Sequence, residues 1–236
     1  MKIVLLTTET THHTYYAWKL NAQFPLAAIV LETRRWVAPF ETSHPFEVLR
    51  DTYEREVLLA DCKSTFTDIA DTRVLETVNS DEGVASLRAL APDVIIIFGT
   101  GRVSAQLIAL PTTACLNLHG GNPEHYRGLD THLWAIYHRD FLNLVTTLHR
   151  VDAELDTGDI VFQSQLQIDK HSRLHHLRAI NTEACLQMSL VALSALESRG
   201  QLPSRKQLTA GRYYSGMPAV LKEDCLKKFE RHVMRL

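Results

Sequence analysis

The segment DVIIIFGTG (residues 93–101) gives the clearest indication of the fold. A short apolar run rich in β-branched residues, from Val94 to Phe98, is typical of a strand buried on both faces of a parallel sheet. The segment ACLNLHGG (residues 114–121) has the same form, with two glycines directly after the strand. Glycine serves where the backbone turns sharply or approaches a ligand, and ligands of open α/β sheets lie beyond the carboxyl ends of strands. The two segments therefore predict strands whose ends mark a crevice.

Strand and helix patterns alternate on both sides of this segment. Further strands are expected at residues 3–7, 26–31, 145–151 and 160–168, and helices at residues 10–21, 46–60, 80–90, 183–197 and 221–234. The alternation predicts an α/β fold with a Rossmann-like, mostly parallel sheet flanked by helices. We expect residues 1–169 to form a catalytic core, and residues 170–236 to complete the same domain with helices and a short extended segment.

Composition and charge restrict the classes of function. The 236 residues carry 25 Lys and Arg against 27 Asp and Glu, which argues against a nucleic-acid binder that works through a bulk basic surface. The four cysteines lie far apart without a CxxC pair, which excludes a zinc ribbon. The N-terminal apolar run covers only Ile3 to Leu6, too short for a signal peptide or a membrane span. We therefore expect a soluble, cytoplasmic protein without membrane or nucleic-acid partners.

Several common cofactor motifs are missing from the sequence. The GTG of residues 99–101 lacks the third glycine and the acidic residue of a dinucleotide fingerprint, and no phosphate loop occurs. The histidines at positions 119, 125, 132 and 138 have neither the spacing of a helical zinc pair nor a neighbouring CxxC. We therefore expect no bound metal.

Polar side chains gather after the second of the two strands. Asn117 and His119 should lie on one face, because side chains along a strand alternate with period two. An amide and a protonated imidazole can both stabilise a developing oxyanion, and the imidazole can also transfer a proton. Asp156 follows a later strand in the turn LDTG, where its carboxylate could orient His119 and favour the protonated form. Spacing alone leaves open that these residues only cap and begin turns.

Residues 117–163 carry a family resemblance. The pattern N-x-H, followed by a Gly- and Pro-containing loop, a strand and D-x-G, resembles the formyltransferases that use 10-formyltetrahydrofolate. This family includes the glycinamide ribonucleotide, methionyl-tRNA and sugar N-formyltransferases. The resemblance implies the formyltransferase fold, with Asn117, His119 and Asp156 as the catalytic residues. It also implies 10-formyltetrahydrofolate as co-substrate and a reaction that needs no metal.

The resemblance also implies positions for both substrates. The folate is expected to contact two loops, with the residues Thr100, Gly101, Arg102, Val103, Val151, Asp152 and Leu155. The acceptor is expected to contact the first loop and the loop after the catalytic histidine, with the residues Thr10, His12, His13, Gly120, Gly121, Asn122, Tyr126 and His132. His149 is open to two interpretations, as an ordinary strand residue or as part of the site.

The identity of the acceptor rests on departures from the family pattern. The loop of residues 7–13 lacks the glycine with which the purine enzyme grips a phosphate, and RYYSGMP (residues 212–218) is similar to short sugar N-formyltransferases. The residues after 169 also leave no room for the RNA-contacting domain of methionyl-tRNA members. The expected acceptor is an amino sugar, nucleotide-linked and used in lipopolysaccharide biosynthesis. Tyr213 and Tyr214 could stack on its base or pack in a subunit interface, and we expect a homodimer.

Three alternatives stay open at this stage. The enzyme could formylate glycinamide ribonucleotide, or it could hydrolyse 10-formyltetrahydrofolate and release formate. It could also be a folate-binding protein without catalysis, although intact Asn117, His119 and Asp156 argue against that.

Overall fold

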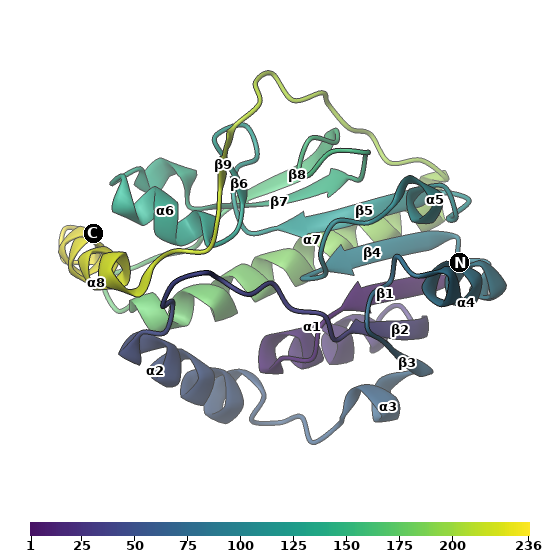
Figure 1. Ribbon diagram of the computed structural model, residues 1–236, viewed down its shortest axis with the longest axis horizontal. Coiled ribbons are helices and arrows are strands. Elements are labelled where there is room, and N and C mark those ends of the chain that lie inside the picture. The colour runs from purple at the N-terminus through teal and green to yellow at the C-terminus, as the bar shows by residue number, and fades with distance from the viewer.

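A seven-stranded sheet lies between two layers of helices in the computed structural model, which describes residues 1–236 (Figure 1). The strand order is β3-β2-β1-β4-β5-β7-β8; the first five strands are parallel, and β7 and β8 are antiparallel to their neighbours. This confirms the mostly parallel sheet expected from the sequence. The strands are β1 (Ile3–Thr7), β2 (Leu26–Glu32), β3 (Thr72–Leu75), β4 (Val94–Phe98), β5 (Ala114–His119), β7 (Val145–Arg150) and β8 (Ile160–Gln165).

The helices that the sequence predicts are all present, and several short elements are added. Local caps fix the starts of two of them, since Thr10 Oγ1 accepts a hydrogen bond from the His13 amide and Ser80 Oγ from the Gly83 amide. The α-helices are α1 (Thr11–Asn21), α2 (Pro45–Tyr53), α3 (Phe66–Ile69), α4 (Asp81–Leu90), α5 (Ala105–Ile108), α6 (Thr131–Tyr137), α7 (Leu177–Arg199) and α8 (Ala219–Val233), and a π-helical turn (Glu54–Leu58) continues α2.

Each face of the sheet has its own hydrophobic core. Alternate residues of β1, β4 and β5 pack with α1 and α7 on one face, and the intervening residues pack with α4 and α5 on the other. Because both faces are covered, the strands are apolar throughout rather than alternating. Helix α7 is long and apolar enough to cross a membrane by length and composition, but eleven of its residues are buried in the protein, as in a core helix.

A third core forms beside the sheet and includes the C-terminal helix. Helix α8 packs against α6 and the start of α7, with Phe46 of α2 in the same cluster. A separate parallel pair, β6 (Tyr126–Gly128) with β9 (Arg212–Tyr214), joins the loop after β5 to the C-terminal part of the chain (Figure 1). The carboxyl ends of β4 and β5 therefore open toward elements from the middle and the end of the sequence.

Candidate active site

Asn117 is held by a histidine on the neighbouring strand. It lies opposite His149 in the antiparallel register of β5 and β7, with 3.0 Å between Asn117 Nδ2 and His149 Nε2. His149 Nδ1 lies 2.7 Å from the Arg150 carbonyl oxygen, which can only accept, so Nδ1 carries a proton. Nε2 of the neutral ring then accepts from the Asn117 amide. The structure thus resolves one open interpretation: His149 contacts a predicted catalytic residue.

His119 is restrained on both sides of its ring. Its Nε2 lies 2.9 Å from the Tyr126 carbonyl oxygen and therefore donates to it. Its Nδ1 lies 3.6 Å from Asp156 Oδ2. The carbonyl of Tyr126 thus contacts His119, its hydroxyl donates to Asp140, and the contact of Tyr126 with the acceptor stays a prediction.

Asp156 lies between the two histidines. Its Oδ1 is 3.5 Å from His149 Nε2, and its Oδ2 accepts a hydrogen bond of 3.0 Å from the Gly128 amide. Burial alone would raise the pKa of Asp156, but the charge interaction with His119 and the hydrogen bond from the Gly128 amide hold the pKa well below its usual value. A buried carboxylate therefore faces His119, and the catalytic role expected of this pair from the sequence stays a prediction.

Two glycines allow this close packing. A Cβ atom on Gly121 would lie 2.8 Å from His119 Nε2 and 2.9 Å from Thr131 Oγ1. A Cβ atom on Gly158 would lie 1.8 Å from the Arg150 carbonyl oxygen. Larger residues at either position would displace the histidine loop or the aspartate turn. Gly121, one of the glycines predicted to mark a crevice, therefore allows segments of the chain itself to approach closely.

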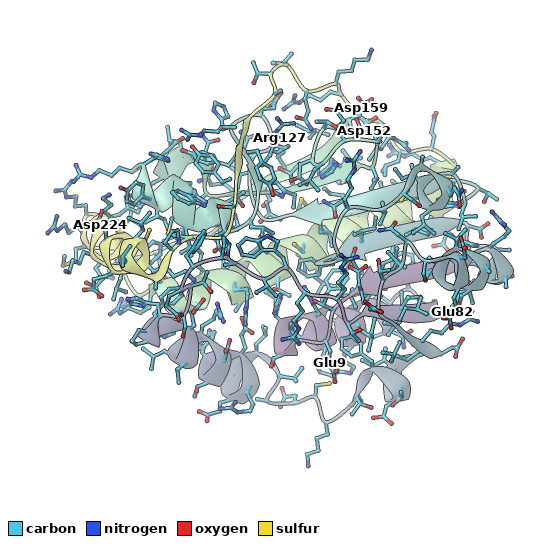
Figure 2. All side chains as sticks on the ribbon, in the orientation of Figure 1. Glu9, Glu82, Arg127, Asp152, Asp159 and Asp224 are labelled. Carbon is cyan, nitrogen blue, oxygen red and sulfur yellow. The ribbon has the colours of Figure 1, made fainter.

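The loops predicted to hold the folate meet next to Asp156. The Gly101 amide donates to Glu32 Oε2 at 2.9 Å, and the Arg102 guanidinium donates to the Ala153 carbonyl oxygen. Asp152 lies on this second loop (Figure 2), and its Oδ1 accepts a hydrogen bond from the Thr157 hydroxyl. The structure therefore brings the two predicted folate loops together, although contact with the folate stays a prediction.

The other residues of these loops differ in their burial and in their hydrogen-bond partners. Val103 is buried, Val151 donates from its amide to Cys115 at 3.0 Å, and Leu155 is partly exposed. Thr100 bonds only the carbonyl of the next residue. Sequence reasoning missed Glu32, a buried carboxylate at the end of β2 that also accepts from the Thr77 hydroxyl and the Val78 amide.

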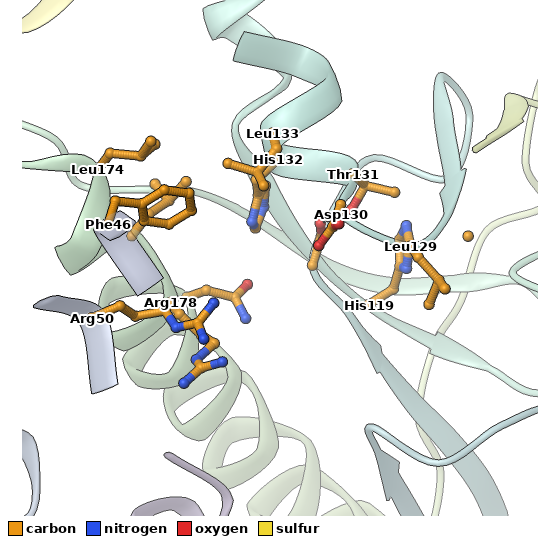
Figure 3. A pocket seen from close by; sticks show the side chains of 14 residues that line it. Phe46, Arg50, His119, Leu129, Asp130, Thr131, His132, Leu133, Leu174 and Arg178 are labelled. Carbon is orange, nitrogen blue, oxygen red and sulfur yellow. Dashed lines mark hydrogen bonds between the residues drawn. The ribbon is translucent and has the colours of Figure 1, made fainter. Parts of the chain in front are cut away.

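A cavity of about 240 Å³ opens from His119 toward helices α2 and α7 (Figure 3). His119 lies at one side of it, and Phe46, Arg50 and Arg178 lie at the other. His132 also lines it and donates from Nε2 to the Val145 carbonyl at 2.8 Å. Burial lowers the pKa of His132 to about 4, so the ring is neutral at physiological pH. Of the predicted acceptor residues, His132 and Gly120 are in this cavity wall.

The cationic side of the cavity is neutralised by acids. Arg178 donates from Nε and a terminal nitrogen to Glu54 at 2.6 and 2.7 Å, and to Asp51 at 2.8 Å. Arg50 pairs with Asp51 at 2.9 Å and with Glu47 at 3.3 Å. The sequence contains no indication of this wall, because α2 and α7 are far apart along the chain.

Other predicted acceptor residues lie outside the cavity wall. Thr10 caps α1, and His13 packs its ring against Phe98 with 4.4 Å between the centroids. His12 Nδ1 lies 3.7 Å from Glu54, and burial lowers the pKa of His12 and His13. The side chains of these three residues thus make contacts within the fold and do not line the cavity, and their contact with the acceptor stays a prediction.

The loop after His119 also binds mainly to itself and its neighbours. Asn122 donates from Nδ2 to Asn143 at 2.9 Å and accepts from the Glu124 amide and from Gln163, so its side chain holds the loop. Tyr214 stacks on Tyr126 within the same chain, with 5.5 Å between ring centroids, whereas Tyr213 is exposed. Intramolecular stacking thus accounts for Tyr214, for which the sequence left a base or a subunit interface as options.

The comparisons with known proteins identify one family. Residues 57–186, more than half of the chain, match the family model described as formyl transferase. The chain is 32% identical over 159 residues to a methionyl-tRNA formyltransferase of Koribacter versatilis, covering 67% of this chain and 50% of that protein. A Thermotoga methionyl-tRNA formyltransferase is 27% identical over 157 residues, with 66% and 49% covered. The chain thus spans about half the length of these curated relatives.

Solved structures share the fold at low sequence identity. A likely sugar N-formyltransferase from Mycobacterium tuberculosis superimposes with a TM-score of 0.63 at 18% identity, covering 91% of this chain and 75% of that one. HypX from Aquifex aeolicus in complex with tetrahydrofolic acid gives 0.58 at 20% identity, covering 94% and 31%. PseJ from Anoxybacillus kamchatkensis, in complex with UDP-4,6-dideoxy-4-formamido-L-AltNAc and tetrahydrofolate, gives 0.53 at 17%, covering 91% and 86%.

Proposed function

Because the chain belongs to the formyl transferase family, we propose that it moves the formyl group of 10-formyltetrahydrofolate to the primary amine of a nucleotide-linked amino sugar. The observation that carries the proposal is the convergence of Asn117 and His119, from the end of β5, with Asp156, from the turn after β7, where His119 lines a cavity. An amide donor, an imidazole and a carboxylate in contact are the groups that acyl transfer to an amine needs.

The proposed reaction proceeds through a tetrahedral intermediate. The neutral amine attacks the formyl carbon, and the carbonyl oxygen becomes negative. The second N–H of Asn117, not used by His149, and protonated His119 stabilise this oxygen. The bond from carbon to N10 then breaks as N10 takes a proton from His119 Nδ1, the ring nitrogen not bonded to the Tyr126 carbonyl, and the attacking amine gives its proton to that nitrogen. Asp156 stabilises the imidazolium throughout, and the products are a formamide and tetrahydrofolate.

The folate side of the site is the junction of the Thr100–Val103 and Val151–Leu155 loops. Arg102 joins these loops, and Asp156 directly follows the second, so a folate seated there would present its formyl group to the histidine. The HypX neighbour, which has tetrahydrofolic acid bound on a similar fold, supports this assignment. The proposal needs no metal, and no group of three metal-ligating side chains occurs in the structure.

The chemistry of the cavity supports a sugar as acceptor. Its wall combines apolar side chains with polar groups, and the charges of Arg50 and Arg178 are already balanced by acids. A neutral ring with hydroxyl groups suits such a wall better than a free phosphate does. The volume of about 240 Å³ is below the usual size of a whole ligand site, so the amine-bearing ring would enter and the nucleotide would lie outside.

Methionyl-tRNA is the second candidate acceptor, because the curated relatives with the most similar sequences are methionyl-tRNA formyltransferases. The net charge of −2 favours the sugar over an RNA. A homodimer, a cytoplasmic location and a place in lipopolysaccharide biosynthesis are parts of the proposal that follow from the sugar. Size-exclusion chromatography with light scattering tests the dimer.

The deciding experiment offers several amines to one enzyme. The purified protein is incubated with 10-formyltetrahydrofolate and with amino-sugar nucleotides, glycinamide ribonucleotide or methionyl-tRNA, and mass spectrometry detects the formylated product. We expect a sugar nucleotide to gain the formyl group, and Asn117→Ala to abolish the gain. Formylation of only methionyl-tRNA or glycinamide ribonucleotide would overturn the sugar assignment. Free formate would indicate a hydrolase, and bound folate without turnover would indicate a binding protein.

A further inference from the structure

The segment between α7 and β9, residues 200–211, which we call the C-terminal strap, crosses the edge of the sheet beside β8 (Figure 1). Arg205 forms an antiparallel bridge with Ile160 of β8, with two backbone hydrogen bonds of 2.8 Å. Its guanidinium also binds both carboxylate oxygens of Glu124, at 2.9 and 2.8 Å. The Gly211 amide donates to the Pro123 carbonyl at 3.0 Å. The strap therefore ties β8 to the loop that follows His119.

One side chain of the strap reaches the aspartate turn. Gln207 Nε2 donates to the Asp156 carbonyl oxygen at 2.8 Å and to the Gly158 carbonyl oxygen at 2.9 Å. Both partners are backbone acceptors, so the orientation of the amide is fixed with nitrogen toward the turn. These two bonds bracket the turn at its first and last residues. Neither the motif N-x-H nor D-x-G includes Gln207.

The turn that Gln207 brackets has an unfavourable backbone. Asp156 has φ of +56°, in the left-handed region that few residues other than glycine adopt. That conformation directs the carboxylate to the Gly128 amide and toward His119. Backbone strain of this kind persists only where surrounding contacts determine it. The Gln207 amide supplies two such contacts from a segment some fifty residues later in the chain.

The oxygen of the same amide forms no hydrogen bond, so hydrogen bonding by the oxygen does not explain where the Gln207 side chain lies. Gln207 Oε1 is buried without a partner, one of two such side-chain atoms in the structure. A buried acceptor without a partner is costly, so its position needs a compensating reason. The two bonds to the aspartate turn supply that reason.

We propose that Gln207 is a positioning residue for the catalytic carboxylate: its amide holds the Asp156–Gly158 turn so that Asp156 faces His119. The inference rests on the proposed function, since Asp156 acts there through the imidazolium. Gln207 itself touches neither substrate in this proposal. Because misplacement of a catalytic group by about 1 Å costs roughly 10² in rate, loss of both bonds should lower kcat by about that factor.

The test removes the amide donor and keeps the size of the side chain. Gln207→Met should lower formyl transfer about 10²-fold in kcat and leave the KM for 10-formyltetrahydrofolate unchanged. Gln207→Asn, one methylene shorter, cannot reach both carbonyl groups and should show a smaller loss in the same direction. Gln201→Met changes an exposed glutamine on the same segment whose side chain forms no hydrogen bond, and it should behave as wild type. Unchanged kcat in both Gln207 variants would refute the proposal.

A second comparison distinguishes a direct effect of Gln207 on the aspartate turn from a general loosening of the C-terminal strap. Arg205→Met removes the ion pair with Glu124 but none of the bonds to the aspartate turn. Arg205→Met should lower the melting temperature at least as much as Gln207→Met does. It should lower kcat less than Gln207→Met does. If Arg205→Met lowers kcat equally, the strap acts only as a structural brace and the positioning role is wrong.

Amide exchange gives a readout that does not depend on turnover. The Gly128 amide donates to Asp156 Oδ2, so its hydrogen exchange reports where that carboxylate lies. Exchange at Gly128 should accelerate in Gln207→Met and stay as in wild type in Gln201→Met. Unchanged exchange would overturn the proposal. If the wild-type protein formylates no amine, the proposed function is wrong. The exchange rate at Gly128 would still show whether Gln207 holds the Asp156 carboxylate in place.

Discussion

Replacing Asp156 with asparagine removes the buried charge and nearly preserves its shape. The carboxylate oxygen lies 3.6 Å from His119 Nδ1. Two unit charges at that distance interact by about 4–5 kcal/mol when the effective dielectric constant is about 20. If the imidazolium forms on the way to the transition state, that stabilisation is lost in the variant. Since about 1.4 kcal/mol corresponds to a factor of ten, Asp156→Asn should lower kcat by about 10³.

The assay follows formyl transfer by mass spectrometry and folding by thermal unfolding. Asp159→Asn is the matched control, because that carboxylate lies three residues away and accepts only from the Ser204 hydroxyl, at 3.4 Å. The control should keep wild-type kcat, and both variants should bind the folate. A folded Asp156→Asn protein with kcat within about tenfold of wild type would show that His119 does not need the neighbouring charge.

Three further predictions follow from buried groups and tight turns. Arg178→Met leaves the fully buried Glu54 unpaired and should cost about 3 kcal/mol in urea unfolding, or roughly 6–12 °C in Tm. Lys227→Met, which breaks an exposed pair, should cost under about 0.5 kcal/mol, and equal losses would contradict the burial argument. Gly158→Ala places a Cβ atom 1.8 Å from a backbone oxygen and should lower kcat; unchanged kcat would mean that the turn can move freely. The pKa of Asp156 is lowered in the folded state, so its charge stabilises the folded protein above about pH 4, and this stabilisation is lost as the pH falls further. The unfolding free energies of wild type and Asp156→Asn should therefore converge between about pH 5 and pH 2.

Local pattern was sufficient for the parallel sheet and for the shared strand face of Asn117 and His119. The apolar runs of β1, β4 and β5 are buried on both faces, so composition alone identifies them as strands. Period two placed Asn117 and His119 on one face of β5, as the structure confirms. Strand β3 was missed because it is a short edge strand, in which Val74 is exposed and the apolar signal is weak.

The cavity wall could not be predicted, because it is built from distant segments. Phe46 and Arg178 come from helices whose own patterns indicate only an amphipathic and an apolar surface. The adjacent histidines His12 and His13 appeared more suitable for a ligand than either, yet Phe98 and Glu54 occupy the space beside them. Burial depends on tertiary packing, so a polar residue in a loop or at a helix start carries no sign of which way it will face.

The parallel pairing of β6 with β9 has a consequence for the order of folding. It joins residues 126–128 to residues 212–214, a contact between segments far apart along the chain. Such non-local pairings close late, and synthesis delivers the N-terminal part first. The parallel half of the sheet can collapse before the last segments arrive, whereas the histidine loop receives its partner strand only afterwards. In refolding, compactness should therefore recover before catalysis, because the hydrophobic core around the parallel strands forms before the histidine loop is complete.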